Sequence, residues 1–443
     1  MDFENTVENI IEKTLGEGAT ACDVVLAASS GKSISCRKQK IEDIEESNEK
    51  IIGIRALINQ KQAFVSSSQI DKENLSKLVT KCVSMAKQAP EDDTAVLGDP
   101  SLFETNLTDL DLFQENETET QKLVDSVLEC EDAALSVEGI SNSEGAGASF
   151  STGEFFLATS NGFRGGYKSS GNSISCSVLA GEGQSMERDY ESSSAIYFED
   201  LPSPASIGKK AANQTLKRLN PKKVASCKVP VVFDKRISKS LVGYLAGAIS
   251  GPAIARGTSF LKDHLHKQIF NKDISIIDDP KIVRGLGSHP FDGEGVISDK
   301  KEIISNGVLT GWLLNTSTAK KLSFKTTGHA SRGIGSPPGV SPSNLYMTNG
   351  INSYDDMIAS IKNGFYVTEL IGMGVNLVTG DYSVGASGMW IENGQISYSV
   401  SEVTIASNLI NMYTNLTAAN DLEFKYRVNA PTIRIDGMTL AGK

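Results

Sequence analysis

Metal-binding side chains are scarce in this sequence. Only 4 of its 443 residues are histidine and only 6 are cysteine. A helical zinc site in a hydrolase needs two imidazoles about one turn apart and a neighbouring carboxylate that activates the metal-bound water. None of the histidines is followed by glutamate and no two are five positions apart; they are His264, His266, His289 and His329. The sequence therefore excludes a self-contained zinc hydrolase of this type.

Closely spaced cysteines are also absent. The cysteines show no C-x-x-C spacing and none follows Cys227; they are Cys22, Cys36, Cys82, Cys130, Cys176 and Cys227. In a chain of this size the pattern favours reduced, mostly buried thiols over a disulfide framework. The first residues are acidic and amphipathic, unlike a secretory signal, and no apolar run approaches the ~18 residues that span a bilayer. We therefore expect a cytoplasmic protein without a membrane segment.

Basic residues are outnumbered by acidic ones, and the net charge is −11. Affinity for a nucleic-acid backbone comes from lysine and arginine displacing counterions, so direct nucleic-acid binding is not expected. At 443 residues the chain also exceeds the roughly 250–300 residues at which a single core stops growing. At least two domains are therefore expected.

Helical and strand-like patterns do not alternate regularly along the chain, which favours an α+β fold over a doubly wound sheet. We predict an N-terminal domain of helices and antiparallel sheet over 1–220, with a subdivision near the acidic stretch 91–118. The segment Asn220-Pro221-Lys222-Lys223 is the clearest boundary signal. A mainly antiparallel, barrel-like domain is predicted over 221–443.

The segment from Glu369 to Ile405 is rich in glycine and β-forming residues but has almost no reactive side chains. Glycine is expected where strands bend, turn or let another backbone approach closely. The sequence Glu392-Asn393-Gly394-Gln395 predicts a hairpin turn between two strands. Such a segment shapes a site without performing chemistry in it.

Read with this segment, several other ordered motifs resemble the TldD/PmbA family, whose members were once called modulators of DNA gyrase. The matching segments are HPFDGEGV at 289–296, SNGVL at 305–309, APTIRID at 430–436, SNGFRGGY at 160–167 and MERDY at 186–190. The resemblance covers most of the chain and is densest in its C-terminal half.

The resemblance implies a zinc site in only one of two subunit types. One type carries a helical H-E-x-x-x-H motif and a late cysteine ligand, whereas the other, called PmbA or TldE, lacks both. Counting back without a gap from the shared Gly257-Thr258-Ser259, the motif positions hold Val242, Gly243 and Gly247. The chain therefore resembles the PmbA-like subunit. It is expected to bind no cofactor and to have no catalytic residue, with zinc expected in a TldD-like partner.

Five residues are candidates for a peptide cleft. Asp292 and Glu294 could form a carboxylate pair, although acids in turns more often cap backbone N–H groups. Arg332 lies in glycine-rich surroundings, where a cation could orient a peptide carbonyl or a carboxylate. Gly372 and Gly374 belong to the glycine-rich segment.

Our leading hypothesis is a PmbA/TldE-like, non-metal subunit of a heteromeric TldD-type zinc protease. As the resemblance implies, its substrate would be an unfolded or extended peptide, bound by pairing with a sheet edge. The alternative is a homodimeric peptide-binding or scaffold protein without proteolytic activity.

An independent hydrolase is the third hypothesis. It would use Asp292 and Glu294, or Ser317 and Lys320 in an S-x-x-K spacing. The same spacing recurs elsewhere, for example from Ser35 to Lys38, so it is background rather than a signal.

Overall fold

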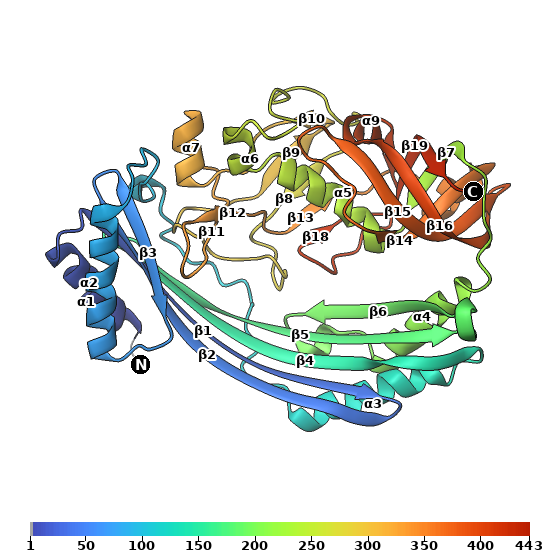
Figure 1. Cartoon of the computed structure of the whole chain (residues 1–443), viewed down its shortest axis with the longest axis horizontal. Coiled ribbons are helices and arrows are strands. Elements are labelled where there is room, and N and C mark those ends of the chain that lie inside the picture. The colour runs from blue at the N-terminus through green and yellow to red at the C-terminus, as the bar shows by residue number, and fades with distance from the viewer. Residues whose placement is uncertain (1–2) are drawn as a thin grey trace.

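The computed structural model describes residues 3–443, which form two β-rich halves (Figure 1). Six antiparallel strands make the N-terminal sheet in the order β3-β2-β1-β4-β5-β6. Four of them are long and curve beneath the C-terminal half. The strands are β1 (Ala21–Arg37), β2 (Lys40–Ile58), β3 (Lys61–Ser67), β4 (Ile140–Thr159), β5 (Arg164–Ala180) and β6 (Glu187–Ala195).

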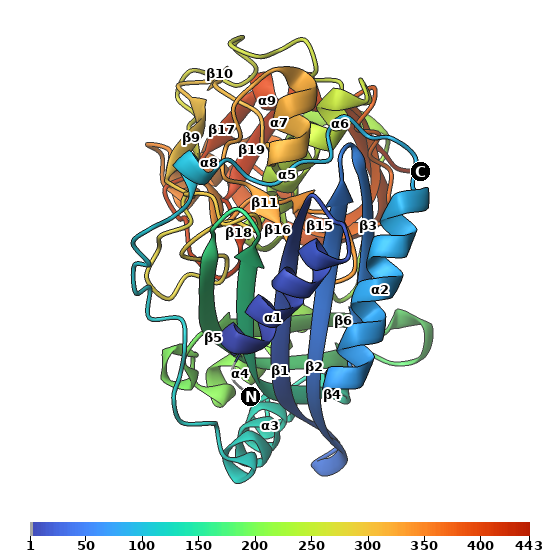
Figure 2. The same cartoon turned by 90° about the vertical axis from the view of Figure 1, so that its left-hand side faces the viewer.

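Two pairs of helices cover one face of this sheet. Helices α1 (Phe3–Gly16) and α2 (Lys72–Gln88) pack at one end (Figure 2), and α3 (Thr120–Leu135) and α4 (Pro204–Lys217) pack at the other. Side chains alternate between faces along a strand, so even-numbered positions of β1 meet both pairs. Val24 and Leu26 contact the first pair, and Ile34 and Cys36 contact the second. Three short 3₁₀ turns complete this half, at Pro100–Leu102, Gly183–Ser185 and Phe198–Asp200.

Five strands of the C-terminal half close into a barrel in the order β16-β15-β14-β7-β19, with β19 pairing back to β16. Strands β7 and β14 run parallel and the other barrel pairs are antiparallel. The strands are β7 (Cys227–Phe233), β14 (Asn363–Ile371), β15 (Asp381–Glu392), β16 (Gln395–Asn408) and β19 (Ile433–Ala441), with β17 (Leu416–Ala418) attached to β19. The predicted α+β fold with a barrel-like C-terminal part is confirmed.

A second, smaller sheet lies beside the barrel in the order β10-β9-β8-β13-β18, and β11 pairs with β12. These strands are β8 (Ile276–Asp278), β9 (Lys301–Ser305), β10 (Val308–Leu309), β11 (Ala330–Ser331), β12 (Gly339–Val340), β13 (Leu345–Met347) and β18 (Val428–Asn429). The helices of this half are α5 (Lys235–Ala248), α6 (Gly251–Ala255), α7 (Thr316–Leu322), α8 (Tyr354–Ala359) and α9 (Leu409–Thr414). One large hydrophobic core joins residues of the barrel, the small sheet and α5.

An aromatic cluster joins the two halves. Phe163 and Tyr167 from the N-terminal sheet region pack edge to face against Phe291 of the C-terminal half, with ring centroids 4.8 and 5.7 Å apart. Such pairs add about 0.5–1.5 kcal/mol beyond the area they bury. Apolar packing therefore fixes the loop that contains Phe291 against the sheet.

A close backbone approach joins the halves at a second point. The Gly53 position on β2 lies directly under the backbone of Ile334, and an added Cβ would be 1.8 Å from the Ile334 carbonyl oxygen. Only glycine permits the two backbones to approach this closely, because any side chain at position 53 would meet backbone atoms that cannot rotate away.

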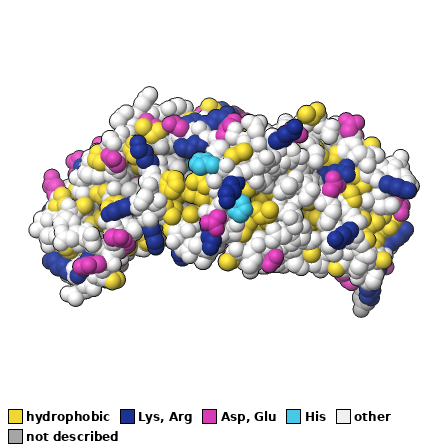
Figure 3. Space-filling view, turned by 90° about the horizontal axis from the view of Figure 1, so that it is seen from above, with side chains coloured by type: hydrophobic (Ala, Val, Ile, Leu, Met, Phe, Trp, Pro, Cys, Tyr) yellow, Lys and Arg dark blue, Asp and Glu magenta, His cyan; other side chains and the backbone are white. Residues whose placement is uncertain are grey.

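The upper face of the molecule shows basic and acidic side chains interspersed, without a continuous basic stripe (Figure 3). Within residues 3–443 no helix has both the length and the apolar composition needed to cross a bilayer.

The contact at Gly53 can be tested by adding one methyl group. We expect Gly53→Ala to lower the free energy of unfolding by about 2–4 kcal/mol, because a Cβ at 1.8 Å must displace the Ile334 backbone. The matched control is Gly243→Ala on α5, where an added Cβ meets nothing within 4 Å. That change should stabilise the helix by about 0.5–1 kcal/mol. Urea unfolding measures both values, and equal effects would contradict the assignment.

Candidate functional site

The centre of the N-terminal sheet carries a face made of serine and glycine. In one cross-strand row of this face, Ser29 lies beside Gly153, and Gly153 lies beside Ser169. Two residues further along the strands, the next row on the same face consists of Ser47, Gly31, Ser151 and Gly171. Directly paired residues share a face of the sheet, and positions two apart return to it. We call these seven residues the serine–glycine face.

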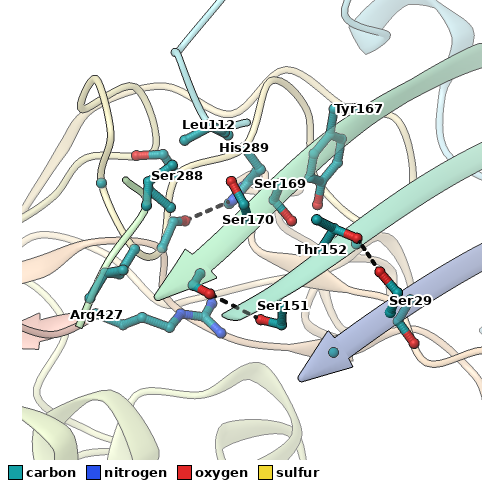
Figure 4. Close-up of a pocket in the computed structure, with 18 of the residues that line it drawn as sticks. Ser29, Leu112, Ser151, Thr152, Tyr167, Ser169, Ser170, Ser288, His289 and Arg427 are labelled. Atoms are coloured by element: carbon teal, nitrogen blue, oxygen red, sulfur yellow. Dashed lines mark hydrogen bonds between the residues drawn. The ribbon is translucent and has the colours of Figure 1, made fainter. Parts of the chain in front are cut away.

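A cleft of about 640 Å³ lies between this face and the C-terminal half (Figure 4). Its opposite wall is the loop from Gly285 to His289, together with Arg427. The hydroxyls of Ser29, Ser47 and Ser169 make no hydrogen bond to another described residue. The volume and the unpartnered hydroxyls suit a polar, extended ligand.

His289 is largely enclosed in the wall of this cleft. Its Nδ1 lies 3.1 Å from the carbonyl oxygen of Gly287. Burial lowers the pKa of His289 to about 4, so its ring is neutral at pH 7. A neutral ring that faces a carbonyl with Nδ1 must carry its proton there, which leaves Nε2 as a hydrogen-bond acceptor.

Arg332, one of the predicted cleft residues, belongs to a buried ion network between the halves. Its guanidinium contacts the Asp23 carboxylate on β1, and Arg55 on β2 lies 3.3 Å from the same carboxylate. The three side chains are between 2% and 5% exposed. Arg55 also donates to Gln62 and to the Val96 carbonyl, at 3.1 and 3.0 Å. Arg332 therefore anchors loop 330–336 to the N-terminal sheet.

Asp292 and Glu294 are buried and engaged by backbone donors. Asp292 accepts hydrogen bonds from the N–H groups of Glu294, Val296 and Ala330, at 2.9, 2.9 and 3.1 Å. Glu294 accepts from the N–H and the hydroxyl of Thr316 at the start of α7, at 2.8 and 2.6 Å. Burial, reinforced by the neighbouring Glu294, raises the pKa of Asp292 well above its ordinary value, against the lowering effect of its donors. This arrangement fixes turns, as acids in glycine-rich turns commonly do.

The five predicted cleft residues do not form one cluster. Asp292 and Arg332 line a second cavity of about 180 Å³, which shares Tyr167, His289 and Arg427 with the larger cleft. Gly372 and Gly374 lie in the loop after β14, where an added Cβ at Gly374 would be 1.6 Å from the Ser383 carbonyl oxygen. Neither glycine lines either cavity.

The positions that would carry zinc ligands lie on α5, which is capped by the Asp234 side chain at the Arg236 N–H. Val242 is fully buried in the core of the C-terminal half, while Gly243 and Gly247 have no side chain. Within residues 3–443 no group of three or more His, Cys, Asp or Glu side chains is placed to hold a metal ion. These residues therefore do not fit a zinc ion.

The residues of the third hypothesis also have structural partners. Ser317 on α7 hydrogen bonds with the Thr94 hydroxyl at 2.9 Å, and Lys320 on the same helix is exposed. No hydrogen bond joins Ser317 to Lys320 among the described residues. The geometry offers no activated nucleophile at this helix.

Sequence reasoning missed the residues that line the larger cleft. The serines alternate along β4 and β5 in a pattern that indicates one polar sheet face, but the pattern does not show which loop faces it. Arg427 and residues 285–288 carry no local signal, because they meet the sheet only after the two halves have packed, and His289 drew notice only as the start of the segment 289–296.

Comparisons with known proteins cover the whole chain. Models of the PmbA/TldA metallopeptidase domain 1, central domain and C-terminal domain match residues 22–86, 114–219 and 226–442. A metalloprotease PmbA homologue of Haemophilus influenzae is 36% identical over 443 residues, covering 100% of this chain and 96% of that one. The metalloprotease PmbA of Escherichia coli O157:H7 is 35% identical with the same coverage.

Solved structures share the fold over the same extent. A protein from Bacteroides thetaiotaomicron described as a candidate modulator of DNA gyrase superimposes with a TM-score of 0.91 at 27% identity, covering 99% of each chain. TldE from Thermococcus kodakarensis superimposes with a TM-score of 0.85 at 20% identity, covering 99% of this chain and 100% of that one.

All three PmbA/TldA metallopeptidase domain models thus match a fold in which a cleft lies between an antiparallel sheet and a barrel-containing half. The chain belongs to the PmbA/TldD family, and along its full length it is similar to the PmbA members.

The ion network predicts a large effect of one arginine on stability. We expect Arg332→Met to lower the free energy of unfolding by about 3–5 kcal/mol, because it leaves part of the buried Asp23 charge uncompensated. Arg188→Met removes an ion pair with Glu144 whose two side chains are 53% and 41% exposed, and should cost at most about 1 kcal/mol. Urea unfolding compares the two, and a loss of similar size in both would contradict a special role for Arg332.

His289 predicts a pH dependence of stability. Its pKa is about 4 in the folded chain, against an ordinary value of 6.5 for histidine, so the unfolded chain binds more protons between these values. The stabilisation is complete above pH 6.5 and is lost as the pH falls toward 4.

Between pH 7 and pH 4.5, we expect the free energy of unfolding of His289→Gln to fall by about 2 kcal/mol less than that of the unmodified protein. Urea midpoints across the pH range measure it. The control is His266→Asn at an exposed position with φ 60°, a conformation that asparagine tolerates. A profile of His289→Gln that parallels the unmodified protein would refute the assignment.

Proposed function

We propose that this chain is the non-metal subunit of a heteromeric TldD-type zinc protease that acts on unfolded or extended peptides. The observation that carries the proposal is a peptide-sized polar cleft in a chain whose motif positions on α5 are a buried valine and two glycines. In this proposal a TldD-like partner supplies the metal and the general base. This chain supplies a wall of the substrate cleft.

A free sheet edge beside the cleft supports binding of an extended peptide. Strand β3 pairs with β2 only from Ile52 to Ile58, so the part of β2 from Lys40 to Ile51 is paired on one side alone among the described residues. Ser47 within this edge also lines the cleft. An extended peptide could add to such an edge through main-chain hydrogen bonds, which tolerate many sequences.

The environment of the cysteines supports a cytoplasmic location in this proposal. All six cysteines are free, and burial raises the pKa of Cys22 and Cys36 to about 12. Thiols held in this way are unreactive and suit a reducing compartment.

The proposal is tested by purifying the chain alone and together with a TldD-like protein that has a complete H-E-x-x-x-H motif. We expect the isolated chain to hold no stoichiometric zinc and to leave an unfolded peptide intact. The pair should contain zinc and cleave the peptide, and a chelator should abolish the cleavage. Metal analysis and peptide mass spectrometry report these results.

Two other results would reject the proposal. Chelator-sensitive cleavage by the isolated chain would show that it is a complete enzyme. Peptide binding by a homodimer that associates with no TldD-like protein would favour the alternative, a peptide-binding or scaffold protein without proteolytic activity.

A further inference from the structure

The larger cleft has an unusual charge composition. The chain carries a net charge of −11, yet the residues that line this cleft include no Asp, Glu or Lys, and their only permanently charged side chain is Arg427. The other lining groups that can hydrogen bond are serine and threonine hydroxyls, backbone groups, Tyr167 and the neutral ring of His289. A ligand with one negative charge would therefore meet a single cation in otherwise neutral surroundings.

The Arg427 guanidinium is available to such a ligand. Its Nη2 donates to the Pro342 carbonyl at 3.2 Å, and no Asp or Glu oxygen lies within 4.0 Å of it among residues 3–443. A guanidinium has five N–H donors, so most remain free. The residue is exposed, and Figure 4 shows its side chain reaching into the cleft on the side of Ser151. Other arginines of the chain, such as Arg236 and Arg284, are each paired with two carboxylates.

The backbone that carries Arg427 is held in place from both sides. On one side the Asn429 side chain accepts from the N–H groups of Lys425 and Tyr426, both at 3.0 Å, and donates to the Tyr426 carbonyl at 2.6 Å. On the other side Val428 pairs with Leu345 on β13. The backbone at Arg427 is thus fixed before a ligand arrives, and the hydrogen bond from Nη2 to Pro342 restrains the side chain, which together reduce the entropic cost of binding.

We propose that Arg427 binds a carboxylate of the extended peptide that lies in the cleft, and so selects peptides by where they carry a negative charge. This inference rests on the proposed function, because it takes the cleft as the peptide site. The planar guanidinium matches a carboxylate through two parallel hydrogen bonds. A phosphate group would bring about −1.5 to −2 charges against one cation, which makes a singly charged carboxylate the better match.

The carboxylate can come from the peptide C-terminus or from an acidic side chain. Three short unstructured peptides of alanine and serine separate the two sources. One has a free C-terminus, one is amidated, and one is amidated but carries a central glutamate. Fluorescence anisotropy of labelled peptides at low salt measures their affinity for the purified chain, alone and in complex with a TldD-like partner.

We expect the free-acid peptide to bind about tenfold or more tightly than the amidated one, as a charge-assisted hydrogen-bonded pair requires. If Arg427 recognises acidic side chains, the glutamate peptide should bind as tightly as the free-acid peptide. If it recognises only the C-terminus, the glutamate peptide should bind as weakly as the amidated one. Arg427→Gln should remove the discrimination, and Arg427→Lys should keep part of it. The control Arg188→Gln changes an exposed arginine that pairs with Glu144 on the N-terminal sheet and lines no cavity described above, and it should keep all of it.

Equal binding of all three peptides, or discrimination that survives in Arg427→Gln, would overturn the proposal, and so would the absence of binding to either preparation. Circular dichroism and the urea midpoint show that each variant is folded.

The proposal about Arg427 and the proposed function can fail independently of each other. Metal-dependent cleavage of the amidated and acid peptides at equal rates would refute carboxylate recognition and leave the proposed function standing. Binding that depends on Arg427, with no cleavage by this chain together with any TldD-like protein, would refute the proposed function and leave carboxylate recognition standing.

Discussion

The Asp23 carboxylate, shared between Arg55 and Arg332, is the interaction on which the site depends. Two of these residues lie on neighbouring strands of the N-terminal sheet and the third lies on a loop of the C-terminal half. The ion pair between Asp23 and Arg332 is buried, so water screens it less than it would screen a pair on the surface. It holds loop 330–336 on the sheet, and the same loop presses its backbone onto Gly53. The two halves are also joined at the far end of the sheet, where Asp189 on β6 pairs with Arg236 on α5 and Arg218 after α4 pairs with Glu369 on β14. The cleft lies between these two joints.

The chemistry left in the cleft is that of recognition. Hydroxyls, glycine backbones, one neutral imidazole and one arginine can hold and orient a peptide, but none is placed as an activated nucleophile. The acidic residues that might have served as a catalytic pair are used as fixed acceptors for backbone N–H groups. Such a wall is useful next to a reaction carried out by groups that belong to another chain, and this is the division of labour that we propose.

Much of the fold could be predicted from the sequence because alternation and helical spacing are local properties. The α+β composition of the N-terminal half and the hairpin at Asn393-Gly394 follow from them, whereas closure of the C-terminal barrel depends on the long-range pairing of β19 with β7 and β16. The larger cleft was not predicted. The candidates Asp292 and Arg332 line the smaller second cavity, and a turn motif does not show whether its acids are buried. Arg427 was missed because its neighbours in the cleft come from strands more than two hundred residues earlier in the chain.

The cleft is made of two walls that differ in how freely they can change. One wall is the middle of a sheet, where each serine or glycine is fixed by the register of four strands. The opposite wall consists of the loop from Gly285 to His289 and the side chain of Arg427. Substitutions in the loop can therefore alter what is bound while the sheet stays the same. Divergence of ligand preference among proteins of this architecture should therefore accumulate at the loop and at position 427, while the serine–glycine face stays constrained by strand pairing.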